Sequence, residues 1–124
     1  MSTLKTNTIK NTDDVEMYLA KAWVNFNGTG TVAIRAAGNV SSITDNGTAD
    51  YTINFTNPMS DANYSPVGMA RFGGAGDLFA MCVVNIVSNI ASPLTTTTAR
   101  IRTFYASGAG GLNDADYVNV AFFR

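Results

Sequence analysis

Side chains that could take part in catalysis are few in this sequence. The 124 residues include no histidine, which removes the commonest general base and the commonest transition-metal ligand. Hydrolysis of a glycosidic bond would need two carboxylates facing each other, about 5–10 Å apart. The acidic residues, however, lie mainly in the N-terminal segment and in predicted turns. We therefore expect a protein that is not an enzyme and that uses no cofactor.

Two glycine-rich segments and one cysteine are further candidates for a chemical role. Residues 73–76 and 108–111 are rich in glycine, but neither matches the phosphate-binding pattern G-x-x-x-x-G-K-[ST] or precedes a helical pattern. Turns that need positive φ explain these glycines. The single cysteine, Cys82, stands in an apolar run with no cation nearby in the sequence. Because apolar burial raises the pKa of a thiol, we expect this side chain to be inert.

Oxygen ligands for a hard cation such as Ca²⁺ occur at two places. One is the cluster Asn113, Asp114 and Asp116, and the other is the pair Asp45 and Asp50. Neither spacing matches an EF-hand loop, and Asn and Asp are common in turns because they hydrogen-bond to the local backbone. We expect turns without a metal ion, and bound Ca²⁺ is the alternative.

The composition argues against nucleic-acid and membrane partners. Charged residues make up only 14% of the chain, against about 25% in typical globular domains, and the formal net charge is −1. The chain offers no basic surface that would neutralise phosphates, so we expect no nucleic-acid binding. The longest apolar stretch, residues 78–84, is far shorter than the roughly 20 residues of a spanning helix, so we expect no membrane insertion.

Short extended segments separated by turns dominate the rest of the chain. In residues 50–56, Tyr51, Ile53 and Phe55 alternate with polar side chains, which gives a strand one apolar and one polar face. Asn-Gly pairs between such segments favour hairpins. The other predicted strands cover residues 23–26, 31–36, 40–44, 64–72, 78–87, 98–105 and 117–123. These eight strands predict an all-β fold, an antiparallel β-sandwich that is jelly-roll-like or fibre-head-like.

The N-terminal segment, residues 1–22, is set apart from the β-sandwich module of residues 23–124. Residues 11–22 are the helix candidate, because Asn11 or Thr12 could cap a helix whose first turn is acidic. The apolar spacing also fits a short coiled-coil seam. A helix packed on its own domain and an extended linker are the alternatives, because helices this short are marginal in water. We therefore expect a short N-terminal arm or helix.

The framework of the chain resembles a known module. The run KAWVNFNGTGTVAIR, followed by NVSSITDNGTADYTINFTNPM and then by DANY, is similar to a module at the C-terminal ends of tail-fibre-type proteins of marine and cyanobacterial bacteriophages. The opening STLKTNTIKN also resembles segments of such fibres. The similarity covers residues 21 to about 71 and, more loosely, the closing YVNVAFFR. It consists of framework residues and turns, so it implies a type of module and does not indicate a ligand.

This resemblance implies a non-enzymatic protein of the virion surface, made in the host cytoplasm, that displays loops for attachment to the host surface. A trimeric capsid decoration (cement) protein or a head-fibre protein is the alternative. Either role needs an attachment to other phage structural proteins of the tail or capsid. We expect the N-terminal arm to provide it, because the arm has too few apolar residues to form a core. The expected particle anchor consists of Leu4, Ile9, Val15 and Leu19.

A homotrimer is expected from two strands that lack a polar face, together with the resemblance to trimeric fibres. Residues 78–87 and 117–123 are apolar on both sides, and monomers rarely expose apolar patches of that size. One face of each strand is therefore assigned to contacts between subunits. The expected trimer interface consists of Phe79, Met81, Val83, Val118, Val120 and Phe122.

Host recognition is expected at the end of the sandwich opposite the arm. The first strand is taken to lead away from the arm, and each later strand is taken to reverse direction. The turns that then share the far end are residues 27–30, 45–49, 72–77 and 106–116. Loops on a rigid sandwich commonly carry binding sites, and aromatic and amide groups suit a host surface glycan. The expected receptor-facing residues are Gly73, Gly74, Tyr105, Gly110, Leu112, Asn113, Asp114, Asp116 and Tyr117.

Overall fold

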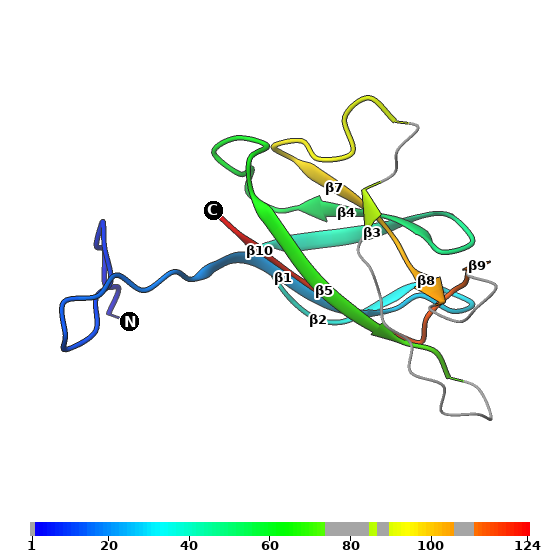
Figure 1. Ribbon diagram of the computed structural model, residues 1–124, viewed down its shortest axis with the longest axis horizontal. Helices are drawn as coiled ribbons and strands as arrows, with labels where there is room; N and C mark the ends of the chain where they lie inside the picture. The colour runs from blue at the N-terminus through cyan, green and yellow to red at the C-terminus, as the bar shows by residue number, and fades with distance from the viewer. Residues whose placement is uncertain (1, 74–84, 87–89, 106–110) are drawn as a thin grey trace.

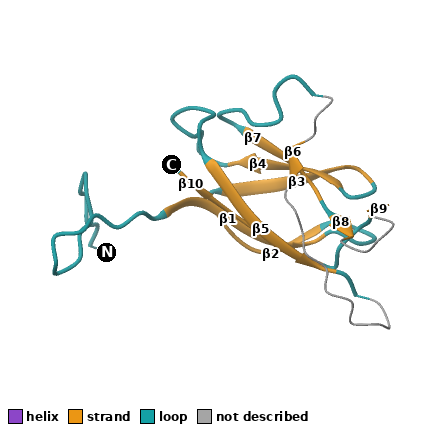
Figure 2. Cartoon of the chain, in the orientation of Figure 1, coloured by secondary structure: helices purple, strands orange, loops and turns teal. Residues whose placement is uncertain are grey.

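A computed structural model describes four parts of the chain, residues 2–73, 85–86, 90–105 and 111–124. These residues form two four-stranded antiparallel sheets and one two-stranded ribbon. Within them the chain contains no helix (Figures 1 and 2). The predicted all-β sandwich of about eight strands is confirmed.

The first sheet, called the β1 sheet here, has the strand order β2-β1-β10-β5. Its strands are β1 (Ala20–Asn27), β2 (Ala33–Gly38), β5 (Ser65–Arg71) and β10 (Tyr117–Phe123). In β1, Ala22, Val24 and Phe26 are buried and alternate with Trp23, which is exposed. The strand therefore has one face in the core and one face on the surface, as the period of two requires.

The second sheet, called the β4 sheet, has the order β3-β4-β7-β6. Its strands are β3 (Val40–Gly47), β4 (Asp50–Phe55), β6 (Asn85–Ile86) and β7 (Thr98–Arg102). The ribbon pairs β8 (Phe104–Tyr105) with β9 (Gly111–Leu112). Only β6 represents the predicted strand 78–87, because most of that segment lies outside the described residues.

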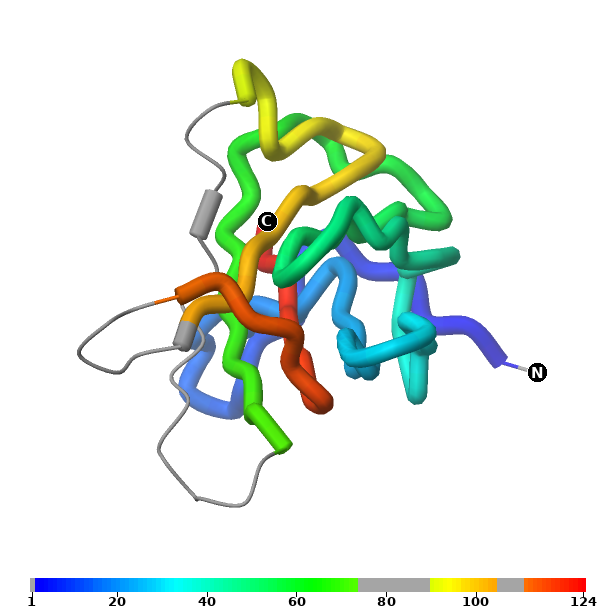
Figure 3. Tube along the Cα trace, turned by 90° about the vertical axis from the view of Figure 1, so that its right-hand side faces the viewer, coloured from blue at the N-terminus to red at the C-terminus, as the bar shows by residue number. Residues whose placement is uncertain are grey.

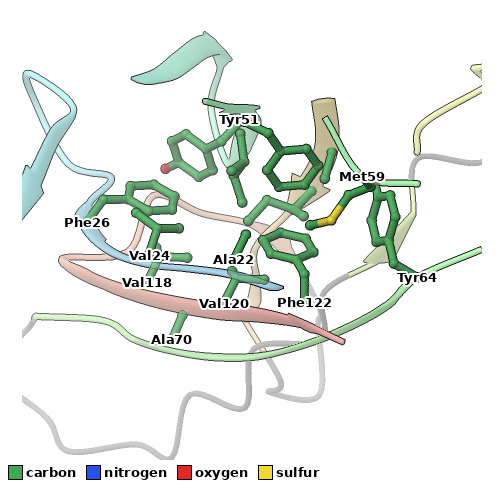
Figure 4. Close-up of a cluster of buried hydrophobic side chains, with 14 of the residues drawn as sticks. Ala22, Val24, Phe26, Tyr51, Met59, Tyr64, Ala70, Val118, Val120 and Phe122 are labelled. Carbon is green, nitrogen blue, oxygen red and sulfur yellow. The ribbon is translucent and has the colours of Figure 1, made fainter. Parts of the chain in front are cut away.

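The core lies between the two sheets, and Figure 4 shows side chains of both sheets pointing toward one another. Tyr51, Ile53 and Phe55 of β4 are buried, as their alternation predicts. Aromatic rings meet edge to face, with centroids 5.1 Å apart for Phe55 and Phe122 and 5.2 Å apart for Phe26 and Tyr51. This geometry is favourable for aromatic pairs beyond the area that they bury.

The predicted trimer interface needs correction at β10. Val118, Val120 and Phe122 are exposed by only 0%, 3% and 0%, and they belong to the core of the chain itself. The strand lies between β1 and β5, so its inner face meets the β4 sheet. Because both faces of β10 are rich in apolar residues, the sequence pattern did not indicate which one points inward. The other assigned residues, Phe79, Met81 and Val83, lie outside the described residues.

Of the alternatives for residues 11–22, the helix and the coiled-coil seam do not form, and the expected N-terminal arm is observed. The arm forms a small hairpin instead, with a bridge between Lys10 and Glu16 and a 2.7 Å hydrogen bond from Met17 N to Ile9 O. The side chain of Asn11 accepts hydrogen bonds from two nearby backbone amides inside this hairpin, which is the turn chemistry of Asn. The strand β1 begins at Ala20, and the arm leads away from the sandwich (Figure 1).

Candidate interaction surfaces

The turns opposite the arm are joined by the buried hydroxyl of Tyr51. This hydroxyl donates hydrogen bonds to Gly28 O at 2.9 Å and to Asp114 Oδ1 at 3.0 Å. The same carboxylate oxygen accepts a 2.7 Å hydrogen bond from Ala49 N, and Gly28 N donates to Ala115 O at 2.8 Å. Three turns far apart in the sequence thus form one unit, which is called the loop end here (Figure 3).

The connections at the other end of the sandwich are joined in the same way. The side-chain amide of Asn39 donates to Lys21 O and to Asn57 O at 3.2 and 3.1 Å. Tyr64 donates its hydroxyl to Thr95 O at 3.0 Å. The described turns at residues 27–30 and 45–49 lie at the loop end, and the connections at Asn39 and Asn57 lie at the other end, as the count of strand directions predicted. Residues 74–77, 88–89 and 106–110 of the other predicted turns lie outside the described residues.

The predicted receptor-facing residues fall into three groups. Leu112 and Tyr117 are 44% and 39% exposed at the loop end, and Gly73 and Asn113 are also exposed there. Asp114 is instead a framework residue, because its carboxylate holds Ala49 N and the Tyr51 hydroxyl. Asp116 also belongs to this second group, because it is partly buried and its carboxylate lies 3.7 Å from Arg71. Gly74, Gly110 and the side chain of Tyr105 lie outside the described residues.

Tyr117 lies beside two arginines that sequence reasoning missed. The guanidinium carbon of Arg35 is 3.9 Å from the centre of the Tyr117 ring, and that of Arg71 is 5.3 Å from it. Arg35 Nη2 also donates to Asp116 O at 2.6 Å, and Arg71 lies 3.7 Å from the Asp116 carboxylate. The three strands that carry these residues meet only in the folded sheet, so no sequence spacing could have revealed the cluster. It places cations at the loop end, where cation–π contacts orient them.

The outer face of the β1 sheet is apolar. Cross-strand pairing places Trp23 beside Ala121 and Ala121 beside Val67, and it places Met69 in the next row. Trp23, Val67 and Met69 are 44%, 53% and 67% exposed. A shallow groove runs over this face, lined by Trp23, Ala36, Val67, Met69, Asn119 and Ala121. Contiguous exposed apolar surface of this kind is typical of an interaction site.

The outer face of the β4 sheet is polar and has extensive internal hydrogen bonding. Arg100 Nε and Nη2 donate to the two Asp50 carboxylate oxygens at 2.7 and 3.0 Å, and Arg102 donates twice to Oδ2 at 3.1 Å. The Arg100 hydrogen bonds lower the pKa of Asp50 against the opposing effect of burial. Asn46 and Asn54 bridge neighbouring strands on the same face. This face differs sharply from the apolar groove of the β1 sheet.

Three of the residues considered for Ca²⁺, Asp45, Asp50 and Asp114, hold protein groups, whereas Asp116 Oδ1 is buried without a hydrogen-bond partner among the described residues. Asp50 holds two guanidinium groups, and Asp45 accepts a 2.9 Å hydrogen bond from Gly47 N within its turn. In the parts of the chain that the structure describes, no three acidic, histidine or cysteine side chains are grouped as metal ligands would be. Cys82 lies outside those parts. The same parts contain no helix that is long and apolar enough to cross a membrane.

The Tyr51 hydroxyl should be needed for a stable loop end. We expect Tyr51→Phe to lower the free energy of unfolding by about 1–2 kcal/mol, because buried Gly28 O loses its hydroxyl donor and Asp114 Oδ1 keeps only Ala49 N among the described donors. Tyr64→Phe is the matched control at the opposite end. Urea denaturation should show similar losses for both variants, whereas hydrogen exchange at the Ala49 amide should quicken only in Tyr51→Phe. Unchanged exchange at Ala49 in Tyr51→Phe would contradict this role.

The geometry thus offers binding surfaces of two kinds. The loop end combines amide, aromatic and guanidinium groups on a hydrogen-bonded framework, and the outer face of the β1 sheet is apolar. The arm adds six exposed large hydrophobic side chains, which are Leu4, Ile9, Val15, Met17, Tyr18 and Leu19.

Comparison of this chain with protein-family models, with curated proteins and with solved structures finds no match.

Proposed function

We propose that this chain is a non-enzymatic surface module of a bacteriophage particle, of the tail-fibre type, whose loop end attaches to the host surface. The observation that carries the proposal is the grouping of hydrogen-bonded turns at the end opposite the arm. A module fixed through its arm would present these turns outward. The sequence resemblance to tail-fibre modules supplies the biological setting.

The loop end has the chemistry of a carbohydrate-binding surface. Asn113 offers an exposed amide and Leu112 an exposed apolar side chain. Tyr117 adds an aromatic ring with the guanidinium of Arg35 over one of its faces. Because Asp114 and Tyr51 hold the framework, these groups are presented with little loss of conformational entropy on binding. The proposed ligand is a glycan of the host surface.

The arm is the proposed attachment to the tail or capsid. Leu4, Ile9, Val15 and Leu19 are 85%, 38%, 57% and 53% exposed, so their apolar side chains are free for another protein. A homotrimer remains part of this proposal. The subunit interface predicted on β10 is withdrawn, because the β10 side chains assigned to it lie in the core.

Binding to bacterial surface polysaccharides tests the loop-end proposal. Immobilised lipopolysaccharides and capsular polysaccharides of marine bacteria and cyanobacteria would be probed with the purified full chain. We expect the double variant Leu112→Ser/Asn113→Ala to bind any positive polysaccharide at least about tenfold more weakly, which corresponds to about 1.4 kcal/mol. Only exposed side chains are changed, because replacing the whole segment would remove the Asp114 framework contacts.

Thr56→Ala/Ser60→Ala, which changes two exposed side chains at the opposite end of the sandwich, is the matched control for that experiment. Both double variants should keep a melting temperature close to that of the unaltered chain. Equal polysaccharide binding by the loop-end variant and the control would contradict recognition at the loop end.

The capsid decoration or head-fibre role is the second candidate. The apolar outer face of the β1 sheet favours it, because a decoration protein buries such a face against its neighbours on the particle. Immunogold labelling of particles with antibodies to this chain distinguishes the two roles. Labelling of the tail supports host attachment, and labelling over the head supports decoration.

A further inference from the structure

Exposed apolar side chains concentrate on two surfaces that do not touch each other within one chain. Of the thirteen large hydrophobic residues exposed in the described parts, six belong to the arm and five to the outer face of the β1 sheet. Those on the sheet are Trp23, Val67, Met69, Tyr117 and Phe123. Two unpartnered apolar surfaces on the same molecule suggest that each could cover the other in an assembly.

The arm segment next to the sandwich has an apolar side and an acidic tip. Val15, Met17 and Leu19 are two residues apart, so an extended chain places them on one side. Their exposed fractions are 57%, 50% and 53%. Asp13 and Glu16 form no ion pair with any described residue, whereas Asp14 is paired with Lys10 at 2.9 Å. The tip is therefore negatively charged.

The outer face of the β1 sheet has the complementary pattern. Its middle is mainly apolar but includes Asn25 and Asn119, and its loop end carries the two cations beside Tyr117. Arg35 forms no ion pair among the described residues, and Arg71 is 68% exposed at 3.7 Å from the Asp116 carboxylate. The guanidinium of Arg35 donates to Asn25 Oδ1 and Asp116 O, which are uncharged, so its charge is not neutralised there, and the exposed Arg71 is held only loosely by Asp116. Both cations therefore attract an acidic partner.

We propose that the arm of a second copy of this chain covers the outer face of the β1 sheet. Val15, Met17 and Leu19 would lie on the apolar groove, and the acidic tip would reach the two arginines. The spacing fits, because the four residue steps from Leu19 to Val15 span about 13 Å when extended. The four steps from Ala121 to Tyr117 on β10 span the same distance, from the Trp23 row to the arginines.

The covering arm comes from a neighbouring copy and not from the same chain. Residues 15–24 contain no Gly, Pro, Asn, Asp or Ser, the residues that favour tight reversals. The arm accordingly leads away from its own sandwich (Figure 1). Reciprocal exchange of arms closes a dimer and cyclic exchange closes a trimer. Val15 and Leu19 are then covered by the neighbouring copy, so attachment to the particle rests on the start of the arm around Leu4. The arm exchange itself does not depend on the virion role.

Two variants with complementary defects test the arm exchange in the full chain. The face variant Val67→Glu/Met69→Glu keeps its arm, and the arm variant Val15→Ser/Met17→Ser/Leu19→Ser keeps its face. Thr56→Glu, at an exposed position just after β4, is the control for added charge. All substituted side chains are exposed or part of the arm, so melting temperatures should stay close to that of the unaltered chain.

Sedimentation velocity at micromolar concentration should show a defined oligomer for the unaltered chain and for Thr56→Glu. Each complementary variant alone should be monomeric. An equimolar mixture of the two should form a heterodimer, because one intact arm then meets one intact face. A monomeric unaltered chain, association of either variant alone, or a mixture that stays monomeric would each overturn the proposal. The last result would indicate contact between two faces or between two arms.

Discussion

Replacing Phe122 with alanine will lower the free energy of unfolding by about 3–5 kcal/mol, the range measured for large buried aromatic residues. The side chain is fully buried, and its ring packs edge to face against Phe55 at 5.1 Å and Tyr64 at 5.7 Å. Alanine removes these contacts and leaves a cavity between the two sheets. Urea denaturation followed by tryptophan fluorescence, at a concentration where the chain is monomeric, measures the loss.

Phe123→Ala is the matched control, because the neighbouring side chain points to the outer face and is 36% exposed. We expect this variant to lose less than about 1 kcal/mol. The pair also separates a core role for Phe122 from the interface role that the sequence predicted. An equal loss in both variants, or a Phe122→Ala loss that disappears in the monomer, would contradict the core role.

Replacing Asp50 with asparagine will destabilise the fold by about 3 kcal/mol, at the low end of the cost of breaking a buried ion pair. Asp50 is only 6% exposed, and four hydrogen bonds from Arg100 and Arg102 end on its carboxylate. An amide keeps the shape but leaves two guanidinium groups without a counter-charge. Urea denaturation at pH 7 measures the difference, with Thr52→Ala on the same face as the control.

The Asp50 contribution should also depend on pH in the acidic range. The Arg100 and Arg102 contacts lower the pKa of Asp50 in the folded state, so the stabilisation is complete above the unfolded pKa of about 4. It is lost as the pH falls from there through the lowered folded value. Asp61 adds to the same trend, because Arg124 lowers its pKa to about 2.

Unfolding free energies measured between pH 6 and pH 2.5 check this dependence. The unaltered chain should lose stability below about pH 4, and Asp50→Asn should lose less over the same interval because its side chain does not titrate. An identical pH slope in the two proteins would show that Asp50 is not the group responsible.

Much of the fold follows from local sequence chemistry. The alternation of Tyr51, Ile53 and Phe55 with polar residues predicted β4 and its buried face, because a strand that is covered on one side repeats every two residues. The last predicted strand has the bounds observed for β10. The reversal of successive strands also predicted that Leu112, Asn113 and Tyr117 would share an end with the turn at residues 27–30.

Local chemistry misled where two structures were compatible with one pattern. Acidic residues after Asn11 suit both a helix N-terminus and a polar turn, and the hairpin prevailed because a helix this short gains little without packing. On β10, both faces are rich in apolar residues, so the pattern did not separate Phe122 in the core from Phe123 on the surface.

The sequence by itself determined the all-β class, most strand positions and the division of turns between the two ends. Only the tertiary structure decided which face of β10 is buried, and only it brought Arg35 and Arg71 to Tyr117 and two arginines to Asp50. The physical reason is the range of the interactions. Alternation and turn preference act over a few neighbouring residues, whereas these clusters depend on strand order and register between distant segments, which are set by packing of the whole core.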